Sequence, residues 1–188
     1  MSNANIIDRS SPIAYKYRLG TRLEALQDQY NALLAAVERI YLNNAHLLTA
    51  PVLVIKAGSS PTVKSSGAFS AMAAGVIQSK SADTDMSAIA GSLATAKSAL
   101  WAFYIDSAGT ISTSTKTADA ADAAAALALK PAVPANKVEL GYIIVSNATG
   151  SAFVGGTTAL DATDVTVTYV NAEAVAATTG AAAVTALD

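Results

Sequence analysis

The fold is decided by the stretch from residue 137 to residue 171, KVELGYIIVSNATGSAFVGGTTALDATDVTVTYVN. Its first part alternates with period 2, the pattern of a β-strand, with Leu140, Tyr142 and Ile144 on one face and Gly141, Ile143 and Val145 on the other. Polar or glycine-rich breaks at residues 147–150 and 155–156 flank the apolar pair 153–154, and residues 165–169 alternate again. The pattern predicts antiparallel strands joined by turns.

Strand patterns continue on the N-terminal side of this stretch. Residues 52–58 form a short apolar run closed by glycine, and two weak strands are expected around residues 73–75. Residues 98–116 predict a hairpin in which Trp101, Phe103 and Ile105 share one face, with a turn at residues 107–109. Residues 117–134 are rich in alanine and predict a short helix that starts at Thr117 or Asp119 and ends at Lys130–Pro131.

A long helix is predicted before these strands, over residues 21–48. Thr21 followed by Glu24 matches a capping box, and Pro51 is expected to stop the helix. Apolar residues recur with alternating spacings of three and four, as in a coiled coil. The predicted seam has a positions at Leu23, Tyr30, Val37 and Asn44 and d positions at Leu26, Leu33, Ile40 and Leu47.

This helix has two interpretations. It could lie on its own domain, or it could pair with copies of itself. The small drift of the heptad pattern and the amide of Asn44 at an a position favour a coil between chains. Apolar residues at the e positions Leu34 and Tyr41 widen the seam, which favours a homotrimer. His46 would then lie at a c position, as a solvated helix residue.

The N-terminal segment is more apolar than a free tail. Pro12 and its serines disfavour a long helix, so an extended arm that lies along another protein is expected, with a disordered terminus as the alternative. The candidate anchoring residues are Ile6, Ile7, Ile13, Tyr15, Tyr17 and Arg18. The predicted organisation is an arm over residues 1–20, a coiled-coil stem over 21–49, a β-rich body over 50–171 and an alanine-rich, low-complexity tail over 172–188.

Composition excludes several functional classes. The chain of 188 residues carries a formal net charge of −2 and no cysteine. We therefore expect no nucleic-acid partner, no polybasic membrane patch and no disulfide framework. No apolar run approaches the roughly 18 residues that a membrane-spanning helix needs, so no membrane partner is expected.

The residues that carry chemistry are few. Asp83 with Asp85, and Asp119 with Asp122, are paired carboxylates, but their serine-, threonine- and alanine-rich surroundings indicate turns and helix starts. A serine triad would have to use the single histidine, and no phosphate-binding loop is present. A glycosylation sequon begins at Asn147 and is interpreted as a chance match in a turn. We expect no catalytic residue, no cofactor and no metal site, and hence a protein that is not an enzyme.

Part of the chain, about residues 52–171, resembles a domain of tailed-bacteriophage virion proteins. Their hairpin W-x-Y/F-x-x-D-x-x-G precedes P-x-x-K-x-x-L-G-Y-x-x-V and F-x-x-G-T-T-x-L. The matching residues are Trp101, Phe103, Asp106, Gly109, Lys137, Leu140, Gly141, Tyr142, Val145, Phe153, Gly156, Thr157, Thr158 and Leu160.

The resemblance implies a structural protein of the virion, assembled in the host cytoplasm. It implies a trimeric capsid decoration or head-fibre protein attached to the major capsid protein. The alternative is a tail, neck or baseplate fibre that binds a host receptor or a partner ring. The expected fold is mainly β, with an N-terminal coiled-coil stem, a small antiparallel β domain and one short alanine-rich helix.

Overall fold

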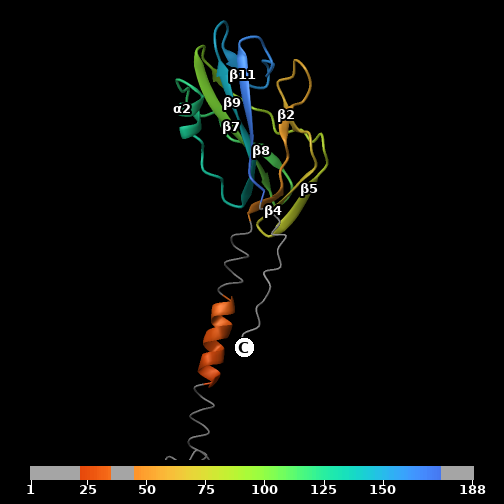
Figure 1. Ribbon diagram of the computed structural model, residues 1–188, viewed down its shortest axis with the longest axis vertical. Coiled ribbons are helices and arrows are strands. Elements are labelled where there is room, and N and C mark those ends of the chain that lie inside the picture. The colour runs from red at the N-terminus through yellow and green to blue at the C-terminus, as the bar shows by residue number, and fades with distance from the viewer. Residues whose placement is uncertain (1–21, 35–44, 175–188) are drawn as a thin grey trace, which may run out of the picture. The chain divides into compact units, whose positions relative to one another are not determined.

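The computed structural model describes residues 22–34 and 45–174. Contacts divide the chain into two units, Met1–Asn43 and Asn44–Asp188. In the first unit, residues 22–34 are α-helical (Figure 1), which confirms the predicted helix over that range. The arm, three seam residues (Val37, Ile40 and Asn44) and residues 175–188 lie outside the described residues.

The predicted end of the stem was wrong. His46–Thr49 form strand β1 in the second unit, so neither His46 nor Leu47 belongs to a helix. Leu47 pairs with Ala71 and is only 2% exposed. A leucine at heptad spacing can equally well occupy the inward position of a strand, and burial in a core outweighs a weak helical preference. Leu47 is therefore a core residue of the body, and the seam cannot extend to it.

The body is built from antiparallel strands arranged in four sheets. The largest sheet has the order β11-β9-β7-β8, and a three-stranded sheet has the order β1-β4-β5. Two further pairs, β2-β3 and β10-β6, complete the strands of the described residues. Their bounds are Leu53–Ile55 (β2), Val63–Ser65 (β3), Phe69–Ala73 (β4), Val76–Lys80 (β5), Ser92–Leu93 (β6), Lys97–Asp106 (β7), Ile111–Thr113 (β8), Lys137–Asn147 (β9), Phe153–Val154 (β10) and Val165–Asn171 (β11).

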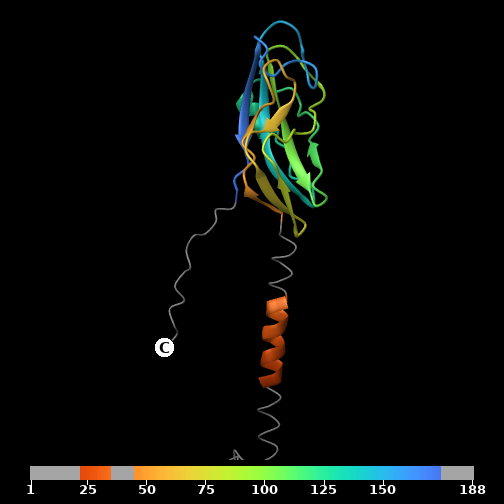
Figure 2. The ribbon, with the colours of Figure 1, turned by 90° about the vertical axis from the view of Figure 1, so that its right-hand side faces the viewer.

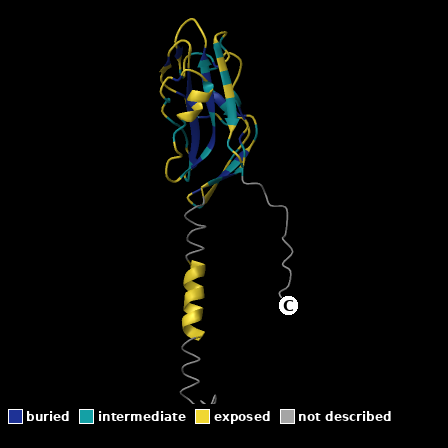
Figure 3. Cartoon of the chain, turned by 60° about the vertical axis from the view of Figure 1, so that its left-hand side comes forward, coloured by how far each residue is buried: buried dark blue, intermediate teal, exposed yellow. Residues whose placement is uncertain are grey.

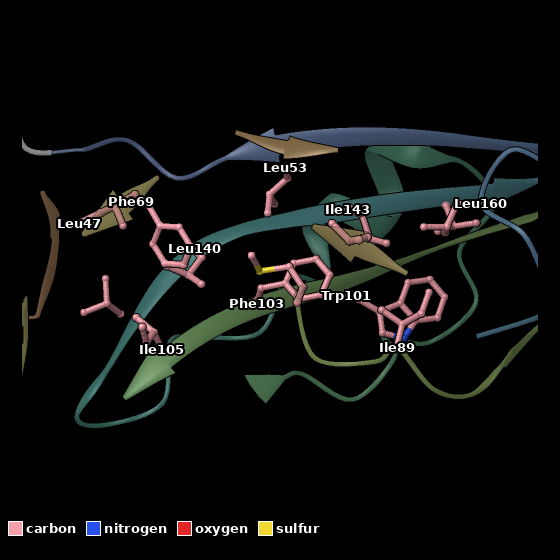
Figure 4. Close-up of a cluster of buried hydrophobic side chains, with 14 of the residues drawn as sticks. Leu47, Leu53, Phe69, Ile89, Trp101, Phe103, Ile105, Leu140, Ile143 and Leu160 are labelled. Carbon is pink, nitrogen blue, oxygen red and sulfur yellow. The ribbon is translucent and has the colours of Figure 1, made fainter. Parts of the chain in front are cut away.

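The four-stranded sheet is covered on both faces (Figures 1 and 2). One face packs against the smaller sheets around a core that includes Trp101, Phe103 and Ile143 (Figure 4). The short helix α2, Ala123–Ala128, covers a smaller cluster on the opposite face, including Leu100 and Ile144. Because both faces are covered, β7 is buried along almost its whole length (Figure 3).

The predicted alternation along β9 was wrong at one point. Phe103 pairs with Gly141 but Tyr104 pairs with Glu139, so Leu140 is an extra residue in the strand. Such a bulge shifts the period-2 pattern by one residue. Leu140 therefore faces the large core together with Ile143, whereas Tyr142 and Ile144 face the α2 side.

The hairpin is confirmed as β7–β8, with Phe103 paired to Thr113 and Ile105 to Ile111. Asp106 holds its turn, because its carboxylate accepts hydrogen bonds from the backbone N–H groups of Ala108 and Thr110, both at 2.9 Å. Asx turns of this kind are a common reason for aspartate at a hairpin end.

Two other local predictions had different outcomes. The weak strands around residues 73–75 are confirmed as β4 and β5, joined by Ala74 and Gly75, both with positive φ. The predicted start of the short helix was wrong, because the N-cap is Asp122, whose carboxylate accepts the N–H of Ala125 at 2.8 Å. Thr117 instead contacts the large sheet, because its hydroxyl accepts a hydrogen bond from the N–H of Leu100 on β7 at 2.9 Å.

Candidate functional site

The first candidate surface is the apolar stripe of the helix over residues 22–34. Its four seam residues, Leu23, Leu26, Tyr30 and Leu33, are 59–63% exposed, and Leu34 beside them is 41% exposed. Residues three and four apart share one face of a helix, so these side chains form one continuous apolar stripe. A stripe of this kind gains stability when it is buried against another surface. The stripe is therefore a candidate oligomer interface.

The second candidate surface is a groove of about 710 Å³ at the end of the body where β1 begins and β11 ends. Three segments line it: the start of β1, the connection from α2 into β9, and the end of β11. Val133, Pro134, Val170 and Ala172 make much of the lining apolar.

A neutralised ion pair lies at this groove. Lys130 Nζ is 2.6 Å from a carboxylate oxygen of Glu139 and 5.0 Å from the centre of the Tyr142 ring. The Glu139 side chain is only 12% exposed, so its charge is held mainly by Lys130. With opposite charges paired, this pair offers no net charge to a ligand, but Lys137 and Glu173 also line the groove.

Two smaller hollows are lined by a mixture of alanine and polar residues. One, of about 490 Å³, lies between residues 87–91 and 113–116, and its side chains are mainly serine, threonine and alanine with Lys116. The other, of about 290 Å³, lies beside the start of α2. The titratable side chain that lines the first hollow is Lys116, and those that line the second are Lys97 and Asp122, of which Asp122 caps α2.

The paired aspartates have structural roles. Asp83 binds Lys64 at 2.6 Å and Asp85 binds Lys56 at 2.5 Å, in pairs that are partly exposed. Asp122 caps α2 as described above. The contact of Asp122 is the capping contact expected of these aspartates, whereas Asp83 and Asp85 form ion pairs with lysines.

Asp119 is held by two donors. Its carboxylate accepts a hydrogen bond from Lys116 Nζ and another from the N–H of Ala94. The hydrogen bond from Lys116 is the main reason that the pKa of Asp119 lies below its ordinary value of 3.8. The negative charge is thereby fixed at the connection before α2, where it ties that connection to residue 94.

The sequon asparagine is part of the core. Asn147 is 2% exposed, and its Nδ2 donates to the carbonyls of Ser151 at 3.1 Å and Ala94 at 3.4 Å. A side chain whose amide group donates to two backbone carbonyls fixes the end of β9. Asn147 is therefore explained by the turn it closes.

Within residues 22–34 and 45–174, no three histidine, cysteine or carboxylate side chains lie together as a metal site would need. Among the helices described, none is long and apolar enough to cross a membrane. No family model, curated protein or solved structure matches the chain.

The predicted site residues thus divide into three groups. Leu23, Leu26, Tyr30 and Leu33 lie together on one exposed helix face, and Leu47 lies in the body core. The other seam residues (Val37, Ile40 and Asn44) and the anchoring residues lie outside the described residues. Sequence reasoning missed the groove, since its walls come from segments 45–47, 130–142 and 170–173, which only folding brings together. The prolines at residues 131 and 134 were the one local sign in the sequence that the chain is extended where it lines the groove.

Proposed function

We propose that this protein is a non-enzymatic structural component of a bacteriophage virion, a homotrimeric capsid decoration or head-fibre protein attached to the major capsid protein. The observation that carries the trimer is the exposed a/d stripe of the helix, with Leu33 63% exposed. The place on a virion is supported by the motif resemblance of the hairpin and the β9–β10 region.

The body supports a structural role over a receptor-binding one. Glycan-binding surfaces commonly present aromatic rings on exposed loops. Here Trp101, Phe103 and Phe153 are each at most 1% exposed, and Trp101 packs edge-on against Phe153 with ring centres 6.0 Å apart. These rings build the core and are not presented to a ligand. The head location is therefore preferred to the tail-fibre alternative.

The proposed attachment is through the N-terminal arm. Three extended arms on one trimer would reinforce one another through effective concentration, which suits a three-fold site on a capsid. The arm residues Ile6, Ile7 and Ile13 would supply apolar contacts along the surface of the major capsid protein.

The test is binding to particles that lack the protein. A variant without residues 2–18 should remain a trimer and lose particle binding. A matched variant without residues 175–188 should bind as the full chain does. Full binding by the arm-deleted trimer would refute attachment through the arm. Binding of either chain to host cells instead of particles would favour the tail-fibre alternative.

A further inference from the structure

The link between β1 and β2 adopts a backbone conformation that its residues do not favour. It consists of Ala50, Pro51 and Val52, between Thr49 at the end of β1 and Leu53 at the start of β2. Val52 has φ of +50°. Of the non-glycine residues with positive φ that the structure describes, Val52 is the one with a β-branched side chain, for which this region is a strained outlier.

The same three residues favour an extended chain. The residue before a proline is driven towards the β region, so Ala50 is biased to be extended. Valine prefers the backbone of a strand, whereas a left-handed turn is the usual place of glycine. The Val52 side chain is 45% exposed, so burial does little to offset the strain. The local sequence therefore disagrees with the observed link, as happens at strained or functional positions.

The contacts of β2 place a hinge at the N–Cα bond of Val52. The Val52 carbonyl accepts a hydrogen bond from the N–H of Ser66 at 2.9 Å, and the N–H of Leu53 donates to Asn171 Oδ1 at 2.7 Å. Both hydrogen bonds lie on the C-terminal side of that bond and hold β2 in place. A change of φ at Val52 alone would therefore redirect Pro51 and β1 and leave β2 where it is.

β1 is an element that can be exchanged without loss of contacts. Among the described strands it pairs with β4 only, at the edge of its sheet, and its register is interrupted between Leu47 and Thr49. Its buried side chain, Leu47, belongs to the same core cluster as Phe69 (Figure 4). An identical body offers an identical place for Leu47 and the same pairing with β4. A β1 that comes from another copy would thus make the same contacts.

We propose that β1 is exchanged between copies of this chain, so that β1 of one copy pairs with β4 of the next and its Leu47 fills that copy's core. The exchange keeps every contact of β1 and lets Val52 adopt a negative φ. Short hinge loops under strain promote such exchange. The inference rests on the homotrimer of the proposed function, because a strand passed from each copy to the next closes a ring of three. Copies already joined through the helix stripe have a high effective concentration for the exchange.

Disulfide trapping tests the exchange, because His46 and Met72 lie directly opposite each other in the β1–β4 pair. Opposite residues of antiparallel strands are within disulfide distance. The chain has no cysteine, so His46→Cys combined with Met72→Cys introduces a single pair of thiols. The purified full-length double variant is oxidised mildly, and its mass is measured after denaturation without reductant.

We expect covalent dimers and trimers from this double variant. A disulfide within one chain, which leaves the denatured protein at the monomer mass, would refute the exchange. Failure to form any disulfide would also refute it, because the exchange requires residues 46 and 72 to be paired.

The matched control is Ser70→Cys combined with Ser79→Cys, at opposite positions of the β4–β5 pair. Ala74 and Gly75 alone join these two strands, so the control disulfide should form within one chain. Covalent dimers from the control as well would contradict an exchange that is specific to β1.

Light scattering on the same samples separates this inference from the proposed function. A trimer with disulfides only within chains would refute the exchange and leave the trimer standing. Interchain disulfides in a protein that scatters as a dimer would support the exchange and refute the trimer. A monomer with disulfides only within chains would refute both.

A glycine substitution at the hinge provides a second measurement. Glycine adopts positive φ without strain, so Val52→Gly favours the link in which β1 stays with its own body. In the double-cysteine chain it should lower the ratio of interchain to intrachain disulfide by about tenfold. Val154→Gly is the control, since Val154 is similarly exposed, at 42%, but lies on β10 away from the link. An unchanged ratio in Val52→Gly would contradict the hinge.

Discussion

The buried hydroxyl of Tyr104 lowers the stability of the fold. It is 2% exposed on the α2 side of the large sheet, and its hydroxyl has no hydrogen-bond partner among the described residues. Burial, and secondarily the charge of Glu139, raises the pKa of Tyr104 above its ordinary value of 10.0. The unfolded chain therefore ionises first, so folding stability is complete below pH 10 and decreases as the pH rises through the pKa of the folded state.

Tyr104→Phe should consequently be neutral or stabilising by about 1 kcal/mol at pH 7, because a buried unpaired hydroxyl is removed. The variant should also lose less stability than the natural chain between pH 9 and pH 11, measured by urea denaturation at each pH. Some alkaline loss should remain, because burial also raises the pKa of Tyr169. A large loss of stability at pH 7 would show that the hydroxyl has a partner.

Trp101 shows how one residue joins several elements. Its side chain is fully buried, its Nε1 donates to the carbonyl of Ala90 at 2.9 Å, and its ring contacts Phe153. Trp101→Ala should lower the free energy of unfolding by about 3–5 kcal/mol, as truncations of buried aromatic residues do. Val154→Ala, at a 42% exposed position, is the control and should change it by less than about 0.5 kcal/mol. A small effect at Trp101, measured by thermal melting, would contradict its role in the core.

At the scale of an element, the bulge in β9 determines which side chains reach which core. Gly141 has φ of +145°, and a Cβ there would lie 2.4 Å from the carbonyl oxygen of Val170 on β11 and 2.8 Å from Leu53 Cδ1. No other residue type fits this position without moving a neighbouring strand. The bulge in turn directs Leu140 into the large core and Tyr142 to the opposite face.

Gly141→Ala should therefore destabilise the body by more than about 1 kcal/mol, through both the backbone conformation and the contact with β11. Gly58→Ala is a suitable control, because a Cβ there meets nothing closer than 3.9 Å. Denaturant unfolding of the two variants gives the comparison. Equal midpoints would mean that β9 can accept a side chain at the bulge.

At the scale of the whole molecule, the helix stripe should control the oligomeric state. Leu26→Asp combined with Leu33→Asp would place charges in a dry seam, so the double variant should be monomeric in light scattering. Ala25→Asp combined with Ala32→Asp adds the same charge at c positions of the same helix and should remain trimeric. If both double variants were trimers, the body rather than the stem would hold the copies together.

The sequence by itself determined the features that depend on local patterns. The helix over residues 22–34, the β7–β8 hairpin and the β4–β5 pair follow from apolar spacing and turn residues, because a helix face and a sheet face have different periods. Tertiary structure decided that Leu47 belongs to β1 and that β9 is bulged at Leu140, next to Gly141. Both results depend on a partner strand distant in the sequence, β4 for Leu47 and β7 for the bulge. The groove likewise exists only when three separate segments meet, and a pattern along one segment cannot encode the packing of its neighbours.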